Sequence, residues 1–442
     1  MTAHLGNHAI VVGAGIGGLA AAAALAPSFA RVIILDRDSL PADTAVRMGA
    51  GQGAHTHQLI KGGEEALERL LPGFTAALQQ AGGVDLRMGL DIKFLDFGGV
   101  LPDHDAGFSV TALSRPAYEA LLHGKVAALS NVTIRDETPV KRFIVEAGGC
   151  TGVELETGDV LRADLVVDAT GMNGPLVQQL TEDGHAAFET ESIRINVAYT
   201  TGRFAQPPEY RGEKRGFFVL PGPPSTGFGL LLPIENNEWI LSLGARGANP
   251  VPRDLPGFLA NAKGFPASDI YDRIRNAELK SDLRTFRKTF VTRRRFDTSS
   301  SWPARLIPIG DAFSSANPTY GQGMTVAALQ ADTLANLLAA RPALDSLASA
   351  YLPAAFEISD RAWGLAINSD YVYDETEGER PPNFPVARAM AGVLRRLCET
   401  DPDFITFRYR LGHMLDTNET LRSGPLAMRF FAALQGAMAP QT

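Results

Sequence analysis

The chain has 442 residues, of which 45% are hydrophobic and 20% charged, and its formal net charge is −8. This length predicts two or three globular domains, and the negative charge argues against a nucleic-acid partner. The 2 cysteines, Cys150 and Cys398, form no CxxC pair, so they predict neither a disulfide framework nor a metal site. No signal peptide is visible before the first apolar run, and no run is long enough to span a bilayer. We therefore expect a cytoplasmic protein.

The N-terminus predicts a dinucleotide site. An apolar strand ending at Val12 is followed by a GxGxxG motif and an Ala-rich helix, which is the context that the motif requires. Its glycines allow a tight turn, a close approach of the backbone to a pyrophosphate, and close packing of helix on strand. A second strand ends in Asp36, where an acidic residue binds a ribose hydroxyl. The candidate ligands are Gly13, Gly15, Ile16, Gly17, Gly18, Asp36 and Arg37.

A Gly-rich loop over residues 47–58 contains Arg47 and two histidines, His55 and His57. The histidines either contact a ligand or are satisfied by hydrogen bonds within the loop, and both interpretations stay open. No carboxylate or cysteine stands at metal-ligand spacing from them, so they do not predict a metal site. A helix over residues 64–71 follows and ends before Pro72.

Strands dominate the middle of the chain. Alternating apolar residues predict strands over 91–97 and 108–113, and Ser114 is a suitable N-cap for the helix that begins at Arg115. Segments over 132–161 predict a small meander, and residues 164–171 predict a buried parallel strand ending in Asp168 and Gly171. Four strands between 193 and 246 predict one mostly antiparallel sheet, polar outside and apolar toward a bound ligand. Candidate pocket residues, for most of which core packing is the simpler explanation, are His57, Phe94, Phe97, Tyr199, Phe218, Leu230, Leu232 and Tyr320.

A basic run over residues 284–295 has two interpretations. It could attract a nucleotide phosphate, or it could be a solvated strand face, because alternation places its members on both sides of a strand. The second interpretation is the simpler one.

A second glycine-rich turn follows the short apolar strand at 306–309. Gly310 and Asp311 open it, and Pro318 with the run 321–324 closes it where a helix begins. Amides at a helix N-terminus have no intrahelical partner and hold a partial negative charge well. The candidate ligands here are Gly310, Asp311, Pro318, Gly321, Gln322, Gly323 and Met324. Helical patterns then run over 345–370, 385–400 and 425–438.

Together the two glycine-rich motifs resemble the FAD-dependent monooxygenases of the para-hydroxybenzoate hydroxylase-like class. Within it, the segments GQGAHTHQL at 51–59, NPTYGQGM at 317–324 and residues 363–378 are most similar to bacterial natural-product polyene epoxidases and hydroxylases. The resemblance implies that the N-terminal motif holds the ADP part of FAD, that Asp311 takes the ribityl chain, and that the 318–324 turn faces the flavin. It also implies FAD contacts for Arg47, Arg115, Asp168 and Gly171. In the family, an Arg that serves NAD(P)H follows the positions of Asp168 and Gly171, and this chain has no Arg there. NADPH or NADH would therefore reduce the flavin either directly or through a separate flavin reductase.

The resemblance implies an α/β and α+β fold. A Rossmann-like FAD-binding domain of the glutathione-reductase type would comprise residues 1–90, 112–185 and 285–342. A mostly antiparallel substrate domain would comprise 91–111 and 186–284, and a helical C-terminal region 343–442. The implied reaction inserts one oxygen of O2, through a C4a-hydroperoxyflavin, into an apolar natural product by epoxidation or hydroxylation. No side chain is predicted to be catalytic.

Three alternatives remain open. A flavin-dependent reductase of prenyl double bonds would share both glycine-rich motifs. A flavoprotein that binds FAD without catalysis would need only these two motifs. A halogenase is disfavoured, because Trp239, Trp302 and Trp363 stand in no WxWxIP motif.

Overall fold

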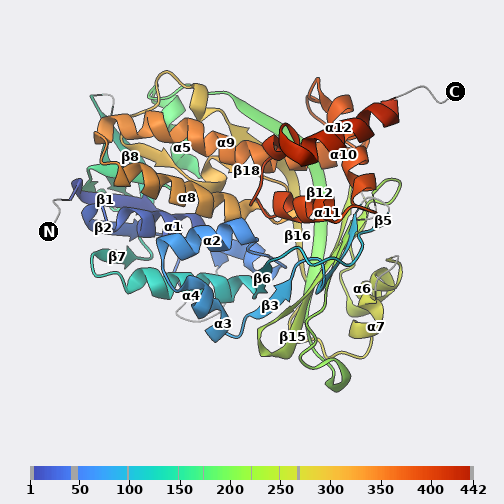
Figure 1. Ribbon diagram of the computed structural model, residues 1–442. Coiled ribbons are helices and arrows are strands. Elements are labelled where there is room, and N and C mark those ends of the chain that lie inside the picture. The colour runs from blue at the N-terminus through green and yellow to red at the C-terminus, as the bar shows by residue number, and fades with distance from the viewer. Residues whose placement is uncertain are drawn as a thin grey trace.

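The computed structural model describes residues 4–40, 48–96, 99–147, 149–172, 174–220, 222–247, 249–265 and 269–438. Figure 1 shows a helix-covered parallel sheet on the left and a long, twisted, mostly antiparallel sheet on the right. This mixed α/β architecture confirms the fold class expected from the sequence.

The N-terminal strand lies at the centre of a five-stranded parallel sheet. Its order is β17 (Leu306–Pro308), β11 (Leu165–Asp168), β1 (Gly6–Val12), β2 (Phe29–Leu35) and β7 (Val132–Arg135). The continuous apolar runs of β1 and β2 suit strands that are buried on both faces. The sequence assigned residues 132–136 to a meander, and this was wrong, because β7 pairs in parallel with β2.

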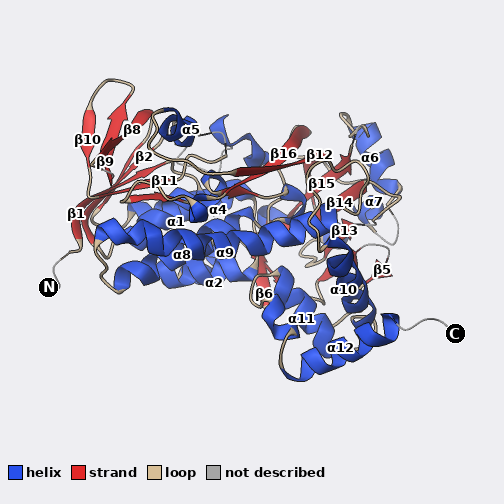
Figure 2. Ribbon diagram, turned by 90° about the horizontal axis from the view of Figure 1, so that it is seen from above, coloured by secondary structure: helices blue, strands red, loops and turns tan. Residues whose placement is uncertain are grey.

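Helices cover one face of this sheet around the largest apolar cluster. They are α1 (Ile16–Leu25), α2 (Lys61–Leu70), α3 (Phe74–Gln80), α4 (Arg115–Ala127), α8 (Gly323–Ala339) and α9 (Leu344–Asp370). Figure 2 shows α1, α8, α9 and α2 lying side by side. The predicted cap is present, since the Ser114 hydroxyl accepts a hydrogen bond from the Ala117 amide at the start of α4. The other face carries α5 (Pro175–Glu182) and the three-stranded meander of β8 (Val140–Glu146), β9 (Gly149–Leu155) and β10 (Val160–Arg162).

The second large sheet has eight strands. Their order is β18 (Ser314–Ser315), β16 (Arg284–Arg294), β12 (Thr190–Ala205), β15 (Glu238–Arg246), β14 (Gly227–Ile234), β13 (Gly216–Leu220), β4 (Ile92–Asp96) and β5 (Gly99–Val100). Only β13 and β4 pair in parallel. Near it, β3 (Val84–Arg87) and β6 (Ser109–Ala112) form a two-stranded sheet.

The sequence predicted a polar outer face for the eight-stranded sheet, and this prediction was wrong. Helices α6 (Leu255–Lys263) and α7 (Ile270–Ile274) cover this face, and they bury Phe204, Phe217 and Trp239 beneath them. The short helical pattern of residues 255–274 was missed. The opposite face packs in part against α10 (Phe384–Leu397), α11 (Pro402–Gly412) and α12 (Gly424–Met438).

Strand β16 belongs to the eight-stranded sheet, whereas the sequence placed residues 285–294 with the dinucleotide-binding region. We therefore propose that the substrate domain extends to about residue 294, and otherwise retain the domain division stated above. Both sheets meet at β16 and β18, where the Gly310 loop lies between them.

Candidate flavin and substrate site

A cavity of about 440 Å³ lies between the two sheets. The loops that follow β1, β2, β11 and β17 form one side of it, at the carboxyl edge of the parallel sheet. Ligands of open parallel sheets bind at this edge. Residues from β12 and β16, Tyr199, Phe286 and Lys288, form part of the other side.

The first wall of the cavity is the GxGxxG turn. Gly13 has φ +106°, and a Cβ there would lie 2.4 Å from the Ala169 carbonyl oxygen. A Cβ on Gly18 would lie 1.8 Å from the Gly13 carbonyl oxygen, so both positions require glycine. Gly15 precedes α1 without any side-chain cap, which leaves the first amides of the helix open to a ligand. The Asp36 carboxylate lies beside this turn and accepts a hydrogen bond from the Ala14 amide at 2.6 Å.

The second wall is the turn from Gly310 to the start of α8. Gly310 and Gly321 both have positive φ, at 63° and 67°. Helix α8 begins after Gln322 with no side-chain cap, so its first amides are also open toward the cavity. The buried Oε1 atom of Gln322 has no hydrogen-bond partner among the residues that the structure describes. An unpartnered buried acceptor and two uncapped helix starts around one cavity fit a polar, anionic cofactor such as FAD.

The structure brings most of the predicted cofactor ligands to this cavity. Those that line it are Gly13, Gly15, Ile16, Gly17, Asp36, Arg37, Arg115, Gly171, Gly310, Asp311, Pro318, Gly321, Gln322, Gly323 and Met324. Gly18 packs behind the turn. Asp168, at the end of β11, is buried, and its Oδ2 has no hydrogen-bond partner among the described residues. Burial raises the pKa of Asp168, and it does the same for the Asp311 carboxyl. Arg47 lies outside the described residues.

A smaller apolar pocket opens from the same cavity. The two share Thr56, His57, Tyr199 and Pro318. The complete lining of the inner pocket is Thr56, His57, Tyr199, Phe218, Val219, Leu220, Phe228, Gly229, Leu230, Ser242, Pro318 and Thr319. Four of the predicted pocket residues, His57, Tyr199, Phe218 and Leu230, are among them.

The other predicted pocket residues lie elsewhere. Phe94 stacks behind Phe218 with the ring centroids 4.5 Å apart, and Leu232 is part of the core under the C-terminal helices. Phe97 lies outside the described residues. The Tyr320 hydroxyl points away from both cavities into a polar cluster, because it donates to Asp370 at 2.9 Å and accepts from Arg246.

Lys288 was not among the ligand residues predicted from the sequence. Its side chain enters the cavity from β16 and donates to the Ser315 hydroxyl. Arg294, six residues further along the same strand, donates to the carbonyl oxygens of Ala312 and Met172 at 2.6 and 2.7 Å. Arg293 on the opposite side is 8% exposed and pairs with Glu191 and with Asp360. The interpretation of this basic run as a solvated face was therefore wrong for these three residues.

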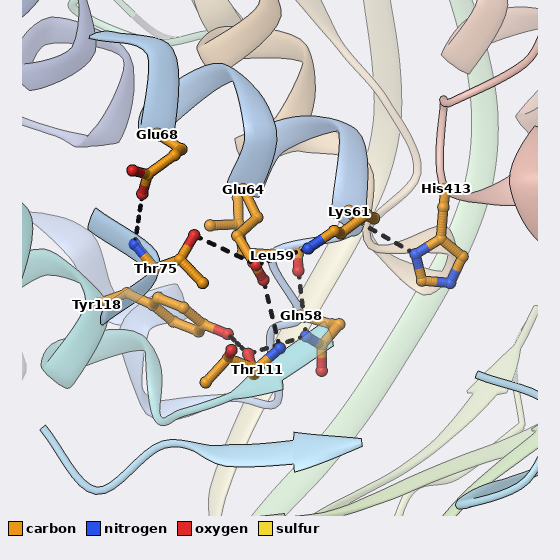
Figure 3. A network of polar contacts seen from close by, with 9 residues as sticks. All are labelled: Gln58, Leu59, Lys61, Glu64, Glu68, Thr75, Thr111, Tyr118 and His413. Carbon is orange, nitrogen blue, oxygen red and sulfur yellow. Dashed lines mark hydrogen bonds and ion pairs between the residues drawn. The ribbon is translucent and has the colours of Figure 1, made fainter. Parts of the chain in front are cut away.

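A buried polar network holds the loop that carries His57. Figure 3 shows it at the start of α2: Glu64, 2% exposed, pairs with Lys61 at 2.9 Å and accepts from the Thr111 amide. Gln58 donates to the Thr111 carbonyl oxygen at 3.2 Å, which anchors the loop itself. The Lys61 amide donates to Nδ1 of His413 at 3.2 Å, so this imidazole caps the helix.

This cap predicts a loss of stability in acid. Burial, with the charges of Lys61 and Arg408, lowers the pKa of His413 to about 3, below the usual value of 6.5. The unfolded chain therefore binds the extra proton first, and the stability contributed by the neutral imidazole is present above pH 6.5 and lost as the pH falls toward 3. We expect unfolding free energies of His413→Asn to fall less steeply over this range, by about 1.4 kcal/mol per pH unit. His8→Asn, at an exposed position, is the matched control. Equal slopes of unfolding free energy against pH for the wild type, His413→Asn and His8→Asn would contradict the prediction.

Known proteins similar to this chain identify its family. A family model described as "FAD binding domain" matches residues 7–351. The chain belongs to this FAD-binding family. Over 470 aligned residues the flavoprotein is 30% identical to Protein Rv3254 of Mycobacterium tuberculosis, covering 98% of this chain and 95% of that one.

Two solved structures show the same fold. A variant of PqsL from P. aeruginosa aligns with a TM-score of 0.65 at 18% identity, covering 84% of this chain and 98% of that one. The tetrameric form of 2-methyl-3-hydroxypyridine-5-carboxylic acid oxygenase aligns with a TM-score of 0.62 at 19% identity, covering 89% and 93%. The family match and the shared fold thus agree with the resemblance to the para-hydroxybenzoate hydroxylase-like class of FAD-dependent oxidoreductases. Among the helices that the structure describes, none combines the length and apolar character that a membrane span requires.

Proposed function

We propose that this flavoprotein is a monooxygenase that inserts one oxygen atom of O2 into an apolar natural product, by alkene epoxidation or by hydroxylation. FAD would bind in the 440 Å³ cavity, with its ADP part at the Gly13 turn and its ribityl chain near Asp311. Bound FAD would supply the oxygen chemistry by activating O2 at its C4a position.

The observation that carries the proposal is the chemistry of the inner pocket. None of the described residues that line it is Asp, Glu, Lys or Arg. Its one imidazole, that of His57, has its pKa lowered to about 3 by burial and by the charge of Arg115, so it is neutral and a weak base. A phenol would need to be deprotonated before oxygen transfer, whereas an alkene needs no protein base. The pocket therefore favours an apolar, unsaturated substrate.

The electron donor is part of the proposal. NADPH or NADH would reduce the flavin directly, or a separate flavin reductase would do so. The loop after Gly171 lacks the family's Arg, and the guanidinium of Arg294 contacts this loop instead, through the Met172 carbonyl oxygen. Bleaching of the flavin by NADPH under argon would select the direct route, and bleaching by dithionite alone would select a partner reductase.

Labelled oxygen tests the function. FAD-loaded protein, reduced with dithionite and given geraniol, a small apolar alkene, under ¹⁸O₂, is expected to yield a product that carries one ¹⁸O atom. Saturation of a double bond under argon would instead support a prenyl reductase. FAD binding, with neither product nor O2 uptake beyond that of free reduced FAD, would support a flavoprotein without catalysis.

A further inference from the structure

Two neighbouring residues interrupt the apolar inner pocket at its junction with the flavin cavity. Thr56 and His57 line both cavities, and the aromatic and aliphatic side chains of Tyr199, Phe218 and Leu230 surround the inner one. Polar groups at such a junction would contact a substrate next to the carbon that faces the flavin.

The structure fixes the tautomer of His57. Its Nδ1 lies 3.0 Å from the carbonyl oxygen of His55, and a carbonyl oxygen can only accept a hydrogen bond. Nδ1 therefore carries the hydrogen of the neutral ring. Nε2 is left with a lone pair, and the residue presents a hydrogen-bond acceptor to the junction.

A chain of hydroxyl groups likewise determines whether the Thr56 hydroxyl can donate or accept a hydrogen bond. Ser242 donates from its hydroxyl to Thr56 Oγ1 at 2.8 Å, so in its own contact with Thr201, at 2.6 Å, Ser242 must accept. Thr201 then accepts in turn from Nδ1 of His55, 2.7 Å away. Every hydrogen of the chain is used except that of the Thr56 hydroxyl, which remains available as a donor.

Thr56 and His57 thus present one donor and one acceptor on adjacent residues. We propose that Thr56 and His57 together bind a hydroxyl group of the substrate: its oxygen accepts from Thr56, and its hydrogen is donated to Nε2 of His57. This inference rests on the proposed function and narrows its substrate class to apolar alcohols whose hydroxyl lies close to the oxygenated carbon. Thr319 supports a ligand at this wall, because the residue is 8% exposed, lines the inner pocket, and has a buried hydroxyl with no hydrogen-bond partner among the described residues.

Matched probes test the pairing without turnover. Oxidised, FAD-loaded protein is titrated with geraniol, geranyl methyl ether and myrcene while the flavin absorbance is recorded. The ether can accept but not donate, and the hydrocarbon can do neither. We expect geraniol to bind about tenfold more tightly than its ether, as one buried hydrogen bond allows. An alcohol-to-ether ratio below about two, or no binding of geraniol up to its solubility limit, would overturn the inference.

Variants locate the effect. His57→Phe should bring the alcohol-to-ether ratio close to one, because it removes the acceptor that only the alcohol can use. Thr56→Val removes the donor that alcohol and ether share, so it should bring the affinities of both closer to that of myrcene. Thr56→Ser keeps the hydroxyl and should leave all three affinities unchanged. Phe218→Leu in the same pocket is the matched control and should weaken all probes alike. An alcohol-to-ether ratio that survives His57→Phe, or an ether-to-myrcene ratio that survives Thr56→Val, would place the hydroxyl elsewhere and overturn the assignment. Because the titration uses oxidised flavin, its result is independent of whether the reduced protein transfers oxygen.

Discussion

Replacing Gly13 by valine is expected to abolish FAD retention. The residue has φ +106°, and a Cβ there would approach the Ala169 carbonyl oxygen to 2.4 Å, so any side chain forces this turn open. The unfavourable backbone conformation costs about 1–3 kcal/mol, and the overlap adds a similar amount. Since the turn is where the pyrophosphate of FAD would bind, we expect affinity for FAD to fall by more than about a hundredfold.

The measurement is the amount of FAD released per mole of purified protein, together with the thermal unfolding temperature. Gly124→Ala in α4 is the matched control, because no atom lies within 4 Å of the added Cβ. In a helix interior this change stabilises by about 0.5–1 kcal/mol. A Gly13→Val protein that keeps one FAD per chain would show that the turn does not hold the cofactor.

Breaking the buried ion pair between Arg246 and Asp370 is expected to lower the unfolding free energy by about 3–5 kcal/mol. The two side chains are 3% and 2% exposed and lie 2.7 Å apart. Asp370, at the end of α9, also accepts from Asn317 and Tyr320, the residues that lead into the Gly321 turn. Asp370→Asn would leave the guanidinium buried without its counter-charge and free this turn, so weaker FAD binding should accompany the loss of stability.

A double-mutant cycle separates the pair from its surroundings. The unfolding free energies of Asp370→Asn, Arg246→Met and the double variant are measured in urea. Once one partner of the pair has been replaced, replacing the other should lower the unfolding free energy much less than the first replacement did. Glu419→Gln removes a pair in which both side chains are about 70% exposed and should change stability by less than about 0.5 kcal/mol. Additive losses in the cycle would mean that the pair contributes nothing as a pair.

Motifs whose chemistry depends on local spacing could be predicted from the sequence. The GxGxxG turn, the Gly310 turn and the Ser114 cap each lie within a few residues, so their strand, loop and helix context can be recognised from the residues themselves. Of the predicted cofactor ligands, those that the structure describes gather at or directly beneath one cavity, although they come from distant parts of the chain.

Features that depend on which strands become neighbours could not be predicted in this way. Lys288 enters the cavity because β16 pairs with both β12 and β18, and nothing in a basic run specifies that pairing. Leu232 has the same apolar character as Leu230, yet one belongs to the core and the other to the pocket. The hydroxyl chain that begins at His55 and ends at Thr56 passes through Ser242, which is 186 positions from Thr56. The chain therefore appears only in the folded sheet.

The reaction of the reduced protein with air tests the central claim most directly. FAD-loaded protein is reduced with dithionite under argon and mixed rapidly with air-saturated buffer while its absorbance is followed. A monooxygenase should return to the oxidised spectrum in two distinguishable steps, because bound FAD would supply oxygen activation in a step separate from the loss of hydrogen peroxide that restores the oxidised flavin. A single step, at the rate of free reduced FAD, would contradict the proposed function.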